Sequence, residues 1–405
     1  MDYFLFFLAL FSGGFMAWGV GANDVANAMG TSVGSKVITI KQAILIAAVF
    51  EGLGAIFGSG GVTDTIRYDL LDIEFYQNDM MVLAYGMIAS LLASATWLML
   101  ATNKGWPVST THSIIGAVVG FGMVSQGPSN IQWIQIISIA ASWLVTPIIS
   151  GITGFIIFKL VQKLVLRHAE PAYCALAFFA ACIGGLAFLA GQFVLDQVDI
   201  QRGSEGLSII FAAIFVSGAY YWRQKSLSKG LSYRQKCQEA ERIFGMLALI
   251  TACIMAFAHG ANDVANAIGP LASVIEILKF GSLQVGSPLP PWVLGFGAAG
   301  VVFGLAIFGY KIMASVGSKI TVLSPSRSFS AQSATGMVVL GASWFGFPVS
   351  TTHTLVGAVL GVGLARGLAA VDLHVVRGIF MSWVITIPAG ALFSIFYFAV
   401  FGVMF

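Results

Sequence analysis

GANDVANA occupies residues 21–28 of this 405-residue chain and returns unchanged at residues 260–267. Each copy places two asparagines and an aspartate inside sequence that is otherwise strongly apolar. A second stretch also recurs: PVSTTHSIIGAVVGFG at 107–122 returns as PVSTTHTLVGAVLGVG at 348–363, with eleven of sixteen residues identical. Because both motifs recur in the same order, the chain is an internal duplication, and any account of its fold must place two matching halves.

The composition predicts an integral membrane protein. The chain is 58% hydrophobic and only 9% charged, whereas a soluble domain carries about 25% charged residues. The apolar runs are long and continuous, which excludes a β-barrel with its short alternating segments. A net charge of +3 without a basic stripe sets nucleic-acid binding aside. We therefore expect a multi-pass protein of the cell membrane with the lipid bilayer as its main solvent.

About 20 apolar residues are needed for a helix to cross the hydrocarbon, and the chain offers ten to twelve such segments. We expect an all-α fold with spans near 3–29, 42–61, 80–101, 131–158, 172–195, 207–222, 243–268, 291–313, 332–346 and 376–404. Two further apolar stretches, 107–125 and 348–365, begin at a proline and are rich in glycine, which is typical of half-helices that do not cross alone.

Charge divides the chain into three parts. Residues 223–242 carry six Lys/Arg against two Glu, and 159–168 add three more basic residues, so both loops are predicted to be cytoplasmic. The stretch 64–79 carries five acids and one arginine and is expected outside. We divide the chain into a first repeat, connecting helices with the basic loop, and a second repeat, at 1–165, 166–242 and 243–405. Duplicated halves that meet at a midplane site are typical of secondary transporters; the span count leaves open whether the repeats are parallel or inverted.

The first motif predicts a cation site. Asn23 and Asn27 share a helix face with Asp24 beside them, and Asn262, Asp263 and Asn266 repeat the pattern. An aspartate at the bilayer centre is expensive and usually faces a cavity or a partner. The motif glycines permit an unwound turn, whose carbonyls would join the carboxylates and amides as hard ligands for a small cation. The alternative is that these side chains only bond neighbouring helices together.

The second motif predicts an anion site. In each copy, proline precedes a triplet of hydroxyl residues, Ser109–Thr111 and Ser350–Thr352. A helix that begins there presents unpaired N–H groups and the positive end of its dipole, which suits a tetrahedral oxyanion. Ordinary N-capping by serine or threonine is the alternative. His112 and His353 follow, but no nucleophile elbow accompanies them, and we expect each to bond a carbonyl or a neighbouring helix, not to catalyse.

Charge balance predicts a coupling ion. Asp24 and Asp263 are negative, the expected anion adds more negative charge, and neither motif contains a Lys or Arg. Because like charges repel strongly in a low dielectric, cations must enter with the anion, and the surrounding oxygens favour Na⁺ over a proton. Glu51, in EGLGAIFG, has no acidic counterpart in the matching FGLAIFG at 303–309. It binds a further cation, gates the path or pairs with a neighbour.

GANDVANA and PVSTTH in both halves, with a basic loop between them, resemble the PiT family of inorganic phosphate transporters over nearly the whole chain. The resemblance implies symport of phosphate with Na⁺ or H⁺ through two inverted repeats. It assigns phosphate binding to Asn27, Asn266 and the two hydroxyl triplets (Ser109, Thr110, Thr111, Ser350, Thr351 and Thr352), and Na⁺ binding to Asn23, Asp24, Asn262, Asp263 and Glu51. Gln332 stands where some relatives have an acid.

The leading hypothesis is sodium-coupled symport of inorganic phosphate by alternating access, with rigid-body rocking of one repeat group against the other. A proton-coupled phosphate or sulfate permease is the alternative. A channel and a structural scaffold are two further classes, and no constellation supports an enzyme. We expect no cofactor apart from Na⁺ as coupling ion; the partners are phosphate, Na⁺ and lipid. A homodimer fits these expectations, although the sequence does not fix the oligomeric state.

Overall fold

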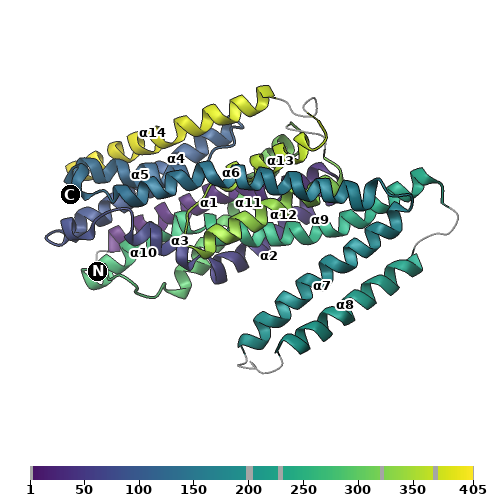
Figure 1. Ribbon diagram of the computed structural model, residues 1–405. Coiled ribbons are helices and arrows are strands. Elements are labelled where there is room, and N and C mark those ends of the chain that lie inside the picture. The colour runs from purple at the N-terminus through teal and green to yellow at the C-terminus, as the bar shows by residue number, and fades with distance from the viewer. Residues whose placement is uncertain (1–2, 198–203, 227–230, 320–322, 368–372, 405) are drawn as a thin grey trace.

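The computed structural model describes residues 3–197, 204–226, 231–319, 323–367 and 373–404, and these ranges are almost wholly helical (Figure 1). Within them the extended pairing is a single bridge between Leu71 and Ile131. Eight of the described helices are long and apolar enough to cross a membrane. The all-α, multi-pass prediction is confirmed.

The first repeat holds six α-helices, and a pair of helices connects it to the second repeat, which holds six more. The first six are α1 (Tyr3–Gly34), α2 (Ile40–Gly58), α3 (Gly60–Tyr68), α4 (Met80–Asn103), α5 (Thr110–Gln126) and α6 (Trp133–Val161). The connecting pair is α7 (Pro171–Gln197) and α8 (Ser204–Ser226). The last six are α9 (Tyr233–Asp263), α10 (Ala265–Phe280), α11 (Pro291–Lys319), α12 (Pro325–Trp344), α13 (Thr351–Leu364) and α14 (Leu373–Met404).

Nine of the ten predicted spans each fall mainly on one helix, whereas 243–268 runs from α9 into α10, and α3 was not predicted. The starts of α9 and α12 differ most from the prediction. α9 begins ten residues before its apolar run because Ser232 and Gln235 form a capping box that starts the helix in polar sequence. α12 begins at Pro325, whose fixed φ suits the first helical turn. Hydrophobicity finds the buried part of a helix, whereas caps set where it begins.

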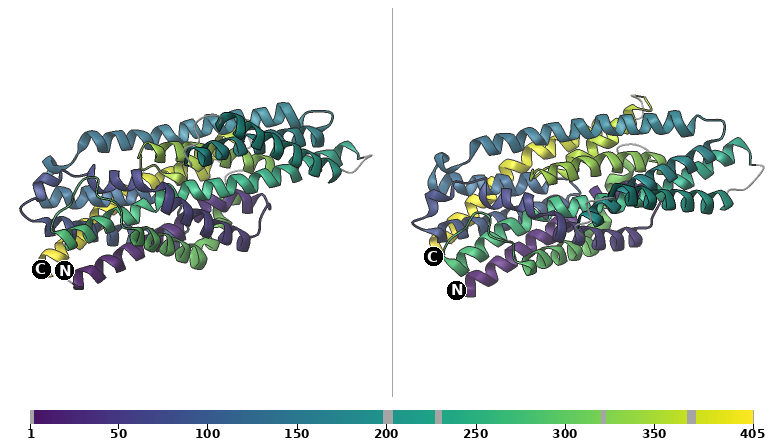
Figure 2. Two further views of the ribbon diagram at one scale, coloured as in Figure 1. Left: turned by 90° about the horizontal axis from the view of Figure 1, so that it is seen from below. Right: turned by 60° about the horizontal axis from the view of Figure 1, so that its bottom comes forward.

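The two halves interlock. α1 packs chiefly on α11 and α9 packs on α2, while α5 lies along α14 and α6 along α13 (Figures 1 and 2). The two GANDVANA-bearing helices run antiparallel: Gly13 near the start of α1 lies against Leu271 of α10, and Ser32 near its end donates to the Ala248 carbonyl of α9 at 3.4 Å. This antiparallel course is the one that inverted repeats require.

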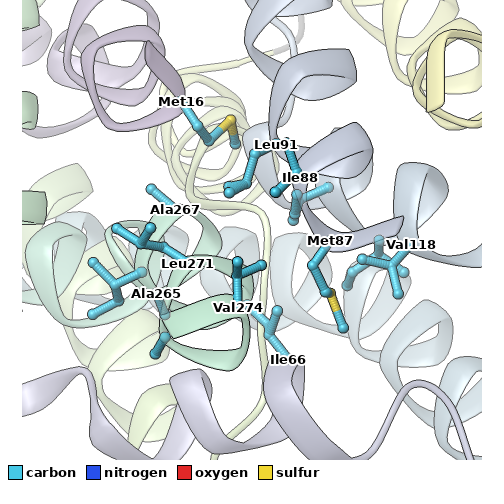
Figure 3. Close-up of a cluster of buried hydrophobic side chains, with 14 of the residues drawn as sticks. Met16, Ile66, Met87, Ile88, Leu91, Val118, Ala265, Ala267, Leu271 and Val274 are labelled. Atoms are coloured by element: carbon cyan, nitrogen blue, oxygen red, sulfur yellow. The ribbon is translucent and has the colours of Figure 1, made fainter. Parts of the chain in front are cut away.

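A core of small and branched side chains fills the space between α1, α3, α4, α5 and α10. Met16, Met87, Leu91 and Leu271 lie in it, all at most 1% exposed (Figure 3). These residues come from both repeats, so folding one half without the other would leave its apolar side chains without their partners. The termini lie at the same end of the bundle (Figures 1 and 2).

The predicted unwound turn is wrong for the first GANDVANA, because α1 runs unbroken through residues 21–28. In the second copy the helix is interrupted at one residue, Val264, between α9 and α10. The motif glycines serve close packing instead. A Cβ on Gly21 would overlap the carbonyl oxygen of Val301, and one on Gly260 would overlap that of Glu51. Small residues let membrane helices approach backbone to backbone.

The two basic stretches lie together, and we call residues 159–170 and 231–242 the basic end. Lys236 forms an ion pair with Glu170, and the Tyr233 hydroxyl donates to the Leu166 carbonyl at 3.4 Å. α7 packs on α9 and α8 packs on α7, at the side of the bundle (Figure 1). The acidic stretch 64–79 instead contacts the end of α10, where Arg67 pairs with Glu276. Residues 198–203, within a second acidic stretch, lie outside the described residues.

Candidate functional site

Two short helices begin at the repeated PVSTTH motifs. α5 and α13 have 17 and 14 residues, and at a rise of 1.5 Å per residue they span about 25 and 21 Å, short of the hydrocarbon thickness. Ser109 and Ser350 are their N-caps, accepting hydrogen bonds from the backbone N–H groups of His112 at 3.2 Å and His353 at 3.3 Å. The first N–H groups of each helix remain without intrahelical partners, so both half-helices present donors at their starts.

The second asparagine of each GANDVANA crosses to the other half. Asn27 donates to Thr352 Oγ1 at 2.7 Å and to Thr351 Oγ1 at 3.3 Å. Asn266 donates to Thr111 Oγ1 at 3.1 Å and to Thr110 Oγ1 at 3.4 Å. Each threonine pair therefore lies against the asparagine of the opposite repeat, and the site contains hydroxyls and amides from both repeats.

The first asparagine of each motif anchors the loop of its own half. Asn23 donates to the Val108 carbonyl at 2.9 Å and accepts from Thr102 Oγ1 at 3.3 Å. Asn262 donates to the Phe347 carbonyl at 3.1 Å and accepts from the Val349 N–H at 3.1 Å. These amides hold the segments that lead into α5 and α13, so each GANDVANA helix fixes the position of the half-helix that follows it.

Asp24 and Asp263 face one shared site. Each is 1% exposed, and one ligand atom each from Asp24, Asp263 and His259 lie within 4.8 Å of one another. Asp24 Oδ1 accepts from Asn23 at 2.9 Å and from Asn27 at 3.1 Å, and Asp263 Oδ2 accepts from Thr351 Oγ1 at 2.6 Å. The other oxygens, Asp24 Oδ2 and Asp263 Oδ1, accept no hydrogen bond among the described residues. Buried carboxylate oxygens that accept no hydrogen bond are suited to bind a cation.

His259, which directly precedes the second GANDVANA, was missed by the sequence prediction. Its Nδ1 lies 3.1 Å from Glu51 Oε1 and its Nε2 lies 3.0 Å from Asp263 Oδ2, with all three side chains buried. Val20 stands at the equivalent place in the first copy. The sequence did contain a signal for this contact, because His259 and Glu51 both lack a chemically equivalent residue in the other repeat. In the structure these two residues contact each other. Glu51 therefore pairs with a neighbour and lies behind His259, one contact away from Asp263.

His112 and His353 meet at the starts of the two half-helices. Their ring centroids are 4.4 Å apart, and His112 lies 3.9 Å from the ring of Trp143. As expected, each histidine contacts a neighbouring helix. The glycines downstream permit equally close packing, since Gly116 lies against Ile387 of α14 and Gly357 against Pro147 of α6.

This chemistry suits a cation and an oxyanion together. Carboxylate and amide oxygens are ligands for hard cations, while threonine hydroxyls, asparagine N–H groups and helix N-termini donate to an oxyanion. Among the described residues, the ion-pair partner of these carboxylates is His259. Buried binding groups from two interlocked repeats, inside a bundle of membrane-spanning helices, define a membrane transporter and not an enzyme.

The comparisons with known proteins agree with this class. The chain matches the phosphate transporter family over residues 20–394. It is 46% identical to a putative phosphate permease of Haemophilus influenzae over 96% of this chain and 94% of that protein. It is 40% identical to the chloroplastic inorganic phosphate transporter 2-1 of Arabidopsis thaliana, over 97% of this chain and 71% of that protein. A solved structure described as the sodium-dependent phosphate transporter superposes with a TM-score of 0.90 at 35% identity, covering 99% of this chain and 100% of that one.

The chain belongs to the phosphate transporter family. The resemblance seen in the two repeated motifs is thereby confirmed, and with it a role in phosphate transport.

Proposed function

We propose that the chain is a symporter that couples Na⁺ entry to the uptake of inorganic phosphate by alternating access. The observation that carries the proposal is the shared placement of Asp24 and Asp263, buried within reach of one ion. The solved relative at 35% identity is described as sodium-dependent, which supports Na⁺ as the coupling ion.

Electrostatics supplies the coupling. Two unit charges 4 Å apart repel by about 4 kcal/mol at an effective dielectric constant of 20. When ionised, Asp24, Asp263 and Glu51 carry three negative charges, of which a protonated His259 offsets one. A phosphate that enters without cations adds to this repulsion, whereas Na⁺ at the carboxylates removes it. Binding of the cation therefore makes the site tolerant of the anion.

We assign the residue roles from the contacts. Na⁺ binds between Asp24 and Asp263, each of which has one carboxylate oxygen without a hydrogen-bond partner. Phosphate binds among the groups that meet from both repeats, which are Asn27, Thr110, Thr111, Asn266, Thr351 and Thr352. Ser109 and Ser350 act as caps, Asn23 and Asn262 position the loops, and Glu51 orients His259. These proposed roles differ from the expectation, in which Ser109 and Ser350 bind phosphate and Asn23, Asn262 and Glu51 bind Na⁺.

Alternating access requires two gates, and we assign each gate to a polar contact on one side of the site. Toward the basic end, Gln332 of α12 bonds Ser32 Oγ at 3.2 Å and the Ala28 carbonyl at 3.2 Å. Toward the opposite end, Arg67 of α3 pairs with Glu276 of α10. Both contacts join one repeat to the other. Rocking of one repeat group against the other opens one gate while the second stays closed.

Uptake of labelled phosphate into proteoliposomes, with Na⁺ and pH gradients set independently, tests the proposal. Concentrative uptake should require Na⁺ and should fall at least about 100-fold in Asp24→Asn and Asp263→Asn, since each loses a charge-assisted interaction with the ion. Glu74→Gln is the matched control, because Glu74 is an exposed acid outside the site. Uptake that persists when choline replaces Na⁺ at fixed pH overturns sodium coupling.

Proton-coupled transport is the second candidate, and one observation favours it. His259 lies between two carboxylates at hydrogen-bonding distance, so a proton can be shared within the site. In that case a pH gradient alone drives uptake in choline medium. Excess unlabelled sulfate, added to the same assay, shows whether the site prefers phosphate or accepts any tetrahedral oxyanion.

A further inference from the structure

A cavity lies at the basic end, apart from the site that contains Asp24 and Asp263. It has a volume of about 660 Å³ and is formed by the turn after α1, the first half of α9 and the start of α12. Its lining includes Lys36, Val37, Arg234, Glu241, Arg242 and Met246. We call it the basic pocket. None of these residues belongs to the two repeated motifs or contacts the proposed transport site.

The basic pocket carries uncompensated positive charge. Of its charged residues, Arg242 pairs with Glu239, and Glu241 accepts hydrogen bonds from the N–H and hydroxyl of Ser326. Across the part of the chain that the structure describes, no acidic partner is recorded for Lys36 or Arg234. Three cations and one carboxylate, that of Glu241, therefore line the cavity, and its net charge is positive.

The two cations, Lys36 and Arg234, lie at opposite kinds of helix end. Lys36 has φ +59°, and it is the non-glycine residue with a positive φ in the described ranges. This left-handed conformation costs about 1–2 kcal/mol for a residue other than glycine. The helix dipole of α1 favours a cation there but does not require the left-handed backbone. Arg234 lies in the first turn of α9, where the positive end of the dipole disfavours a cation. The left-handed turn is closed by the backbone of α1, because the N–H groups of Lys36 and Val37 donate to the carbonyls of Val33 and Ser32, both at 3.0 Å. An anion in the pocket would offset the dipole penalty at Arg234.

The pocket also has an apolar floor. Val37, Gly245, Met246 and Leu249 line it beneath the charged groups, and Val37 lies 3.9 Å from the position that a Cβ on Gly245 would take. A basic mouth at the end of membrane-spanning helices with an apolar floor suits a phosphate group that is attached to hydrocarbon. Lysine and arginine are the side chains that bind phosphate oxygens.

We propose that the basic pocket binds a phosphate-bearing anion, supplied by the headgroup of an anionic phospholipid or by free inorganic phosphate. Lys36 and Arg234 contact the phosphate oxygens, and the apolar floor accommodates the first carbons of a lipid chain. The site is distinct from the one between the two aspartates. Its test is a binding measurement, so its failure leaves the proposed transport function untouched.

The test compares the purified wild type with Lys36→Gln/Arg234→Gln in two arms. In the first arm, phosphatidylglycerol or phosphatidylcholine is added in detergent and the bound lipid is counted by native mass spectrometry. In the second arm, no anionic lipid is present and the number of labelled phosphate ions bound per chain is measured by equilibrium dialysis. If the source is lipid, the double variant binds phosphatidylglycerol at least about tenfold more weakly, since each basic residue near an anionic headgroup contributes about 1 kcal/mol. If the source is free phosphate, the wild type binds one ion more than the variant.

Two further variants keep the test decisive. Lys163→Gln/Arg167→Gln removes the same charge from exposed positions at the basic end outside the pocket, and it should match the wild type in both arms. Lys36→Gly removes one of the two charges while glycine accepts the left-handed backbone, so it should weaken lipid binding by about fivefold in a fully folded protein. Equal binding by the wild type and the double variant in both arms overturns the proposal, as does an equal loss in the control pair.

Discussion

The two copies of GANDVANA contain the same eight residues, yet their aspartates have different surroundings. Asp24 accepts from two amides, those of Asn23 and Asn27. Asp263 accepts from the Thr351 hydroxyl and lies 3.0 Å from Nε2 of His259. The first carboxylate is thus held by neutral donors, while the second lies beside a group that can carry positive charge.

The difference originates outside the motif. Val20 and His259 precede the two copies. Glu51 of α2 has Val301 at the matching position of α11, since Gly260 packs on the Glu51 carbonyl as Gly21 packs on that of Val301. The shared residues build a nearly symmetric frame, in which each first asparagine anchors its own loop and each second asparagine crosses to the other half. The unshared residues then make two chemically different aspartates within one site.

Substitution of the first glycine of each GANDVANA should give the largest effect, a loss of folded protein. In Gly21→Ala and Gly260→Ala, the new methyl group meets a backbone oxygen of the packed helix, Val301 O or Glu51 O. A backbone cannot move aside as a side chain can, so both variants should lose folded protein in the membrane to a similar extent. Size-exclusion profiles of the solubilised protein measure this loss.

Gly52→Ala is the matched control for these substitutions. Gly52 lies within α2, and a Cβ there has nothing within 4 Å. Alanine in an unobstructed helix interior stabilises by about 0.5–1 kcal/mol. A Gly21→Ala protein that behaves like Gly52→Ala would contradict the close packing of α1 on α11.

Substitution of His259 should give the next largest effect, a loss of stability. His259→Gln leaves the carboxylates of Glu51 and Asp263 buried without their shared partner, and removal of one member of a buried ion pair costs about 3–5 kcal/mol. Thermal unfolding of the detergent-solubilised protein measures this loss of stability. Glu51→Gln/His259→Gln should recover much of it, because the second substitution removes a stranded charge.

Comparison of the single and double variants shows whether Glu51 and His259 stabilise the protein as a coupled pair. Single losses that add in the double variant would show that Glu51 and His259 act independently. Val20→Ala, at the matching place in the first repeat, should cost far less, since Val20 contributes only packing.

Much of the fold was predictable because its signals are local. Apolar runs located the helices, and Pro107 and Pro348 marked the segments that lead into α5 and α13. The duplication also indicated that Asp24 and Asp263 belong to one site, since matching halves of a transporter meet at the middle. The shared cluster agrees with that expectation.

Contacts between distant segments were not predictable in the same way. Nothing local indicates that Glu51 meets His259, because α2 and α9 are far apart in the chain and come together only through packing at Gly54 and Gly260. Asn23 and Asn27 share a helix face, as the spacing predicted, but they bond to different halves. Spacing determines the direction in which a side chain points, whereas the fold determines its partner.

The crossing asparagines provide the smallest and most symmetric effect. Asn27→Ala and Asn266→Ala each remove hydrogen bonds to a threonine pair of the opposite repeat. In the proposed function these amides also donate to the bound phosphate. A hydrogen bond to a charged group contributes about 1.5–3 kcal/mol, so each variant should weaken phosphate binding by roughly tenfold or more. The two amides make matching bonds to the threonine pairs, and they differ in the further bond from Asn27 to Asp24. Their effects on phosphate binding should therefore agree within about threefold. Phosphate titration of uptake at saturating Na⁺ measures both. If the phosphate affinities of the two variants differ tenfold or more, phosphate binds closer to one repeat. The symmetric contacts would then stabilise the fold, and the two repeats would not contribute equally to phosphate binding.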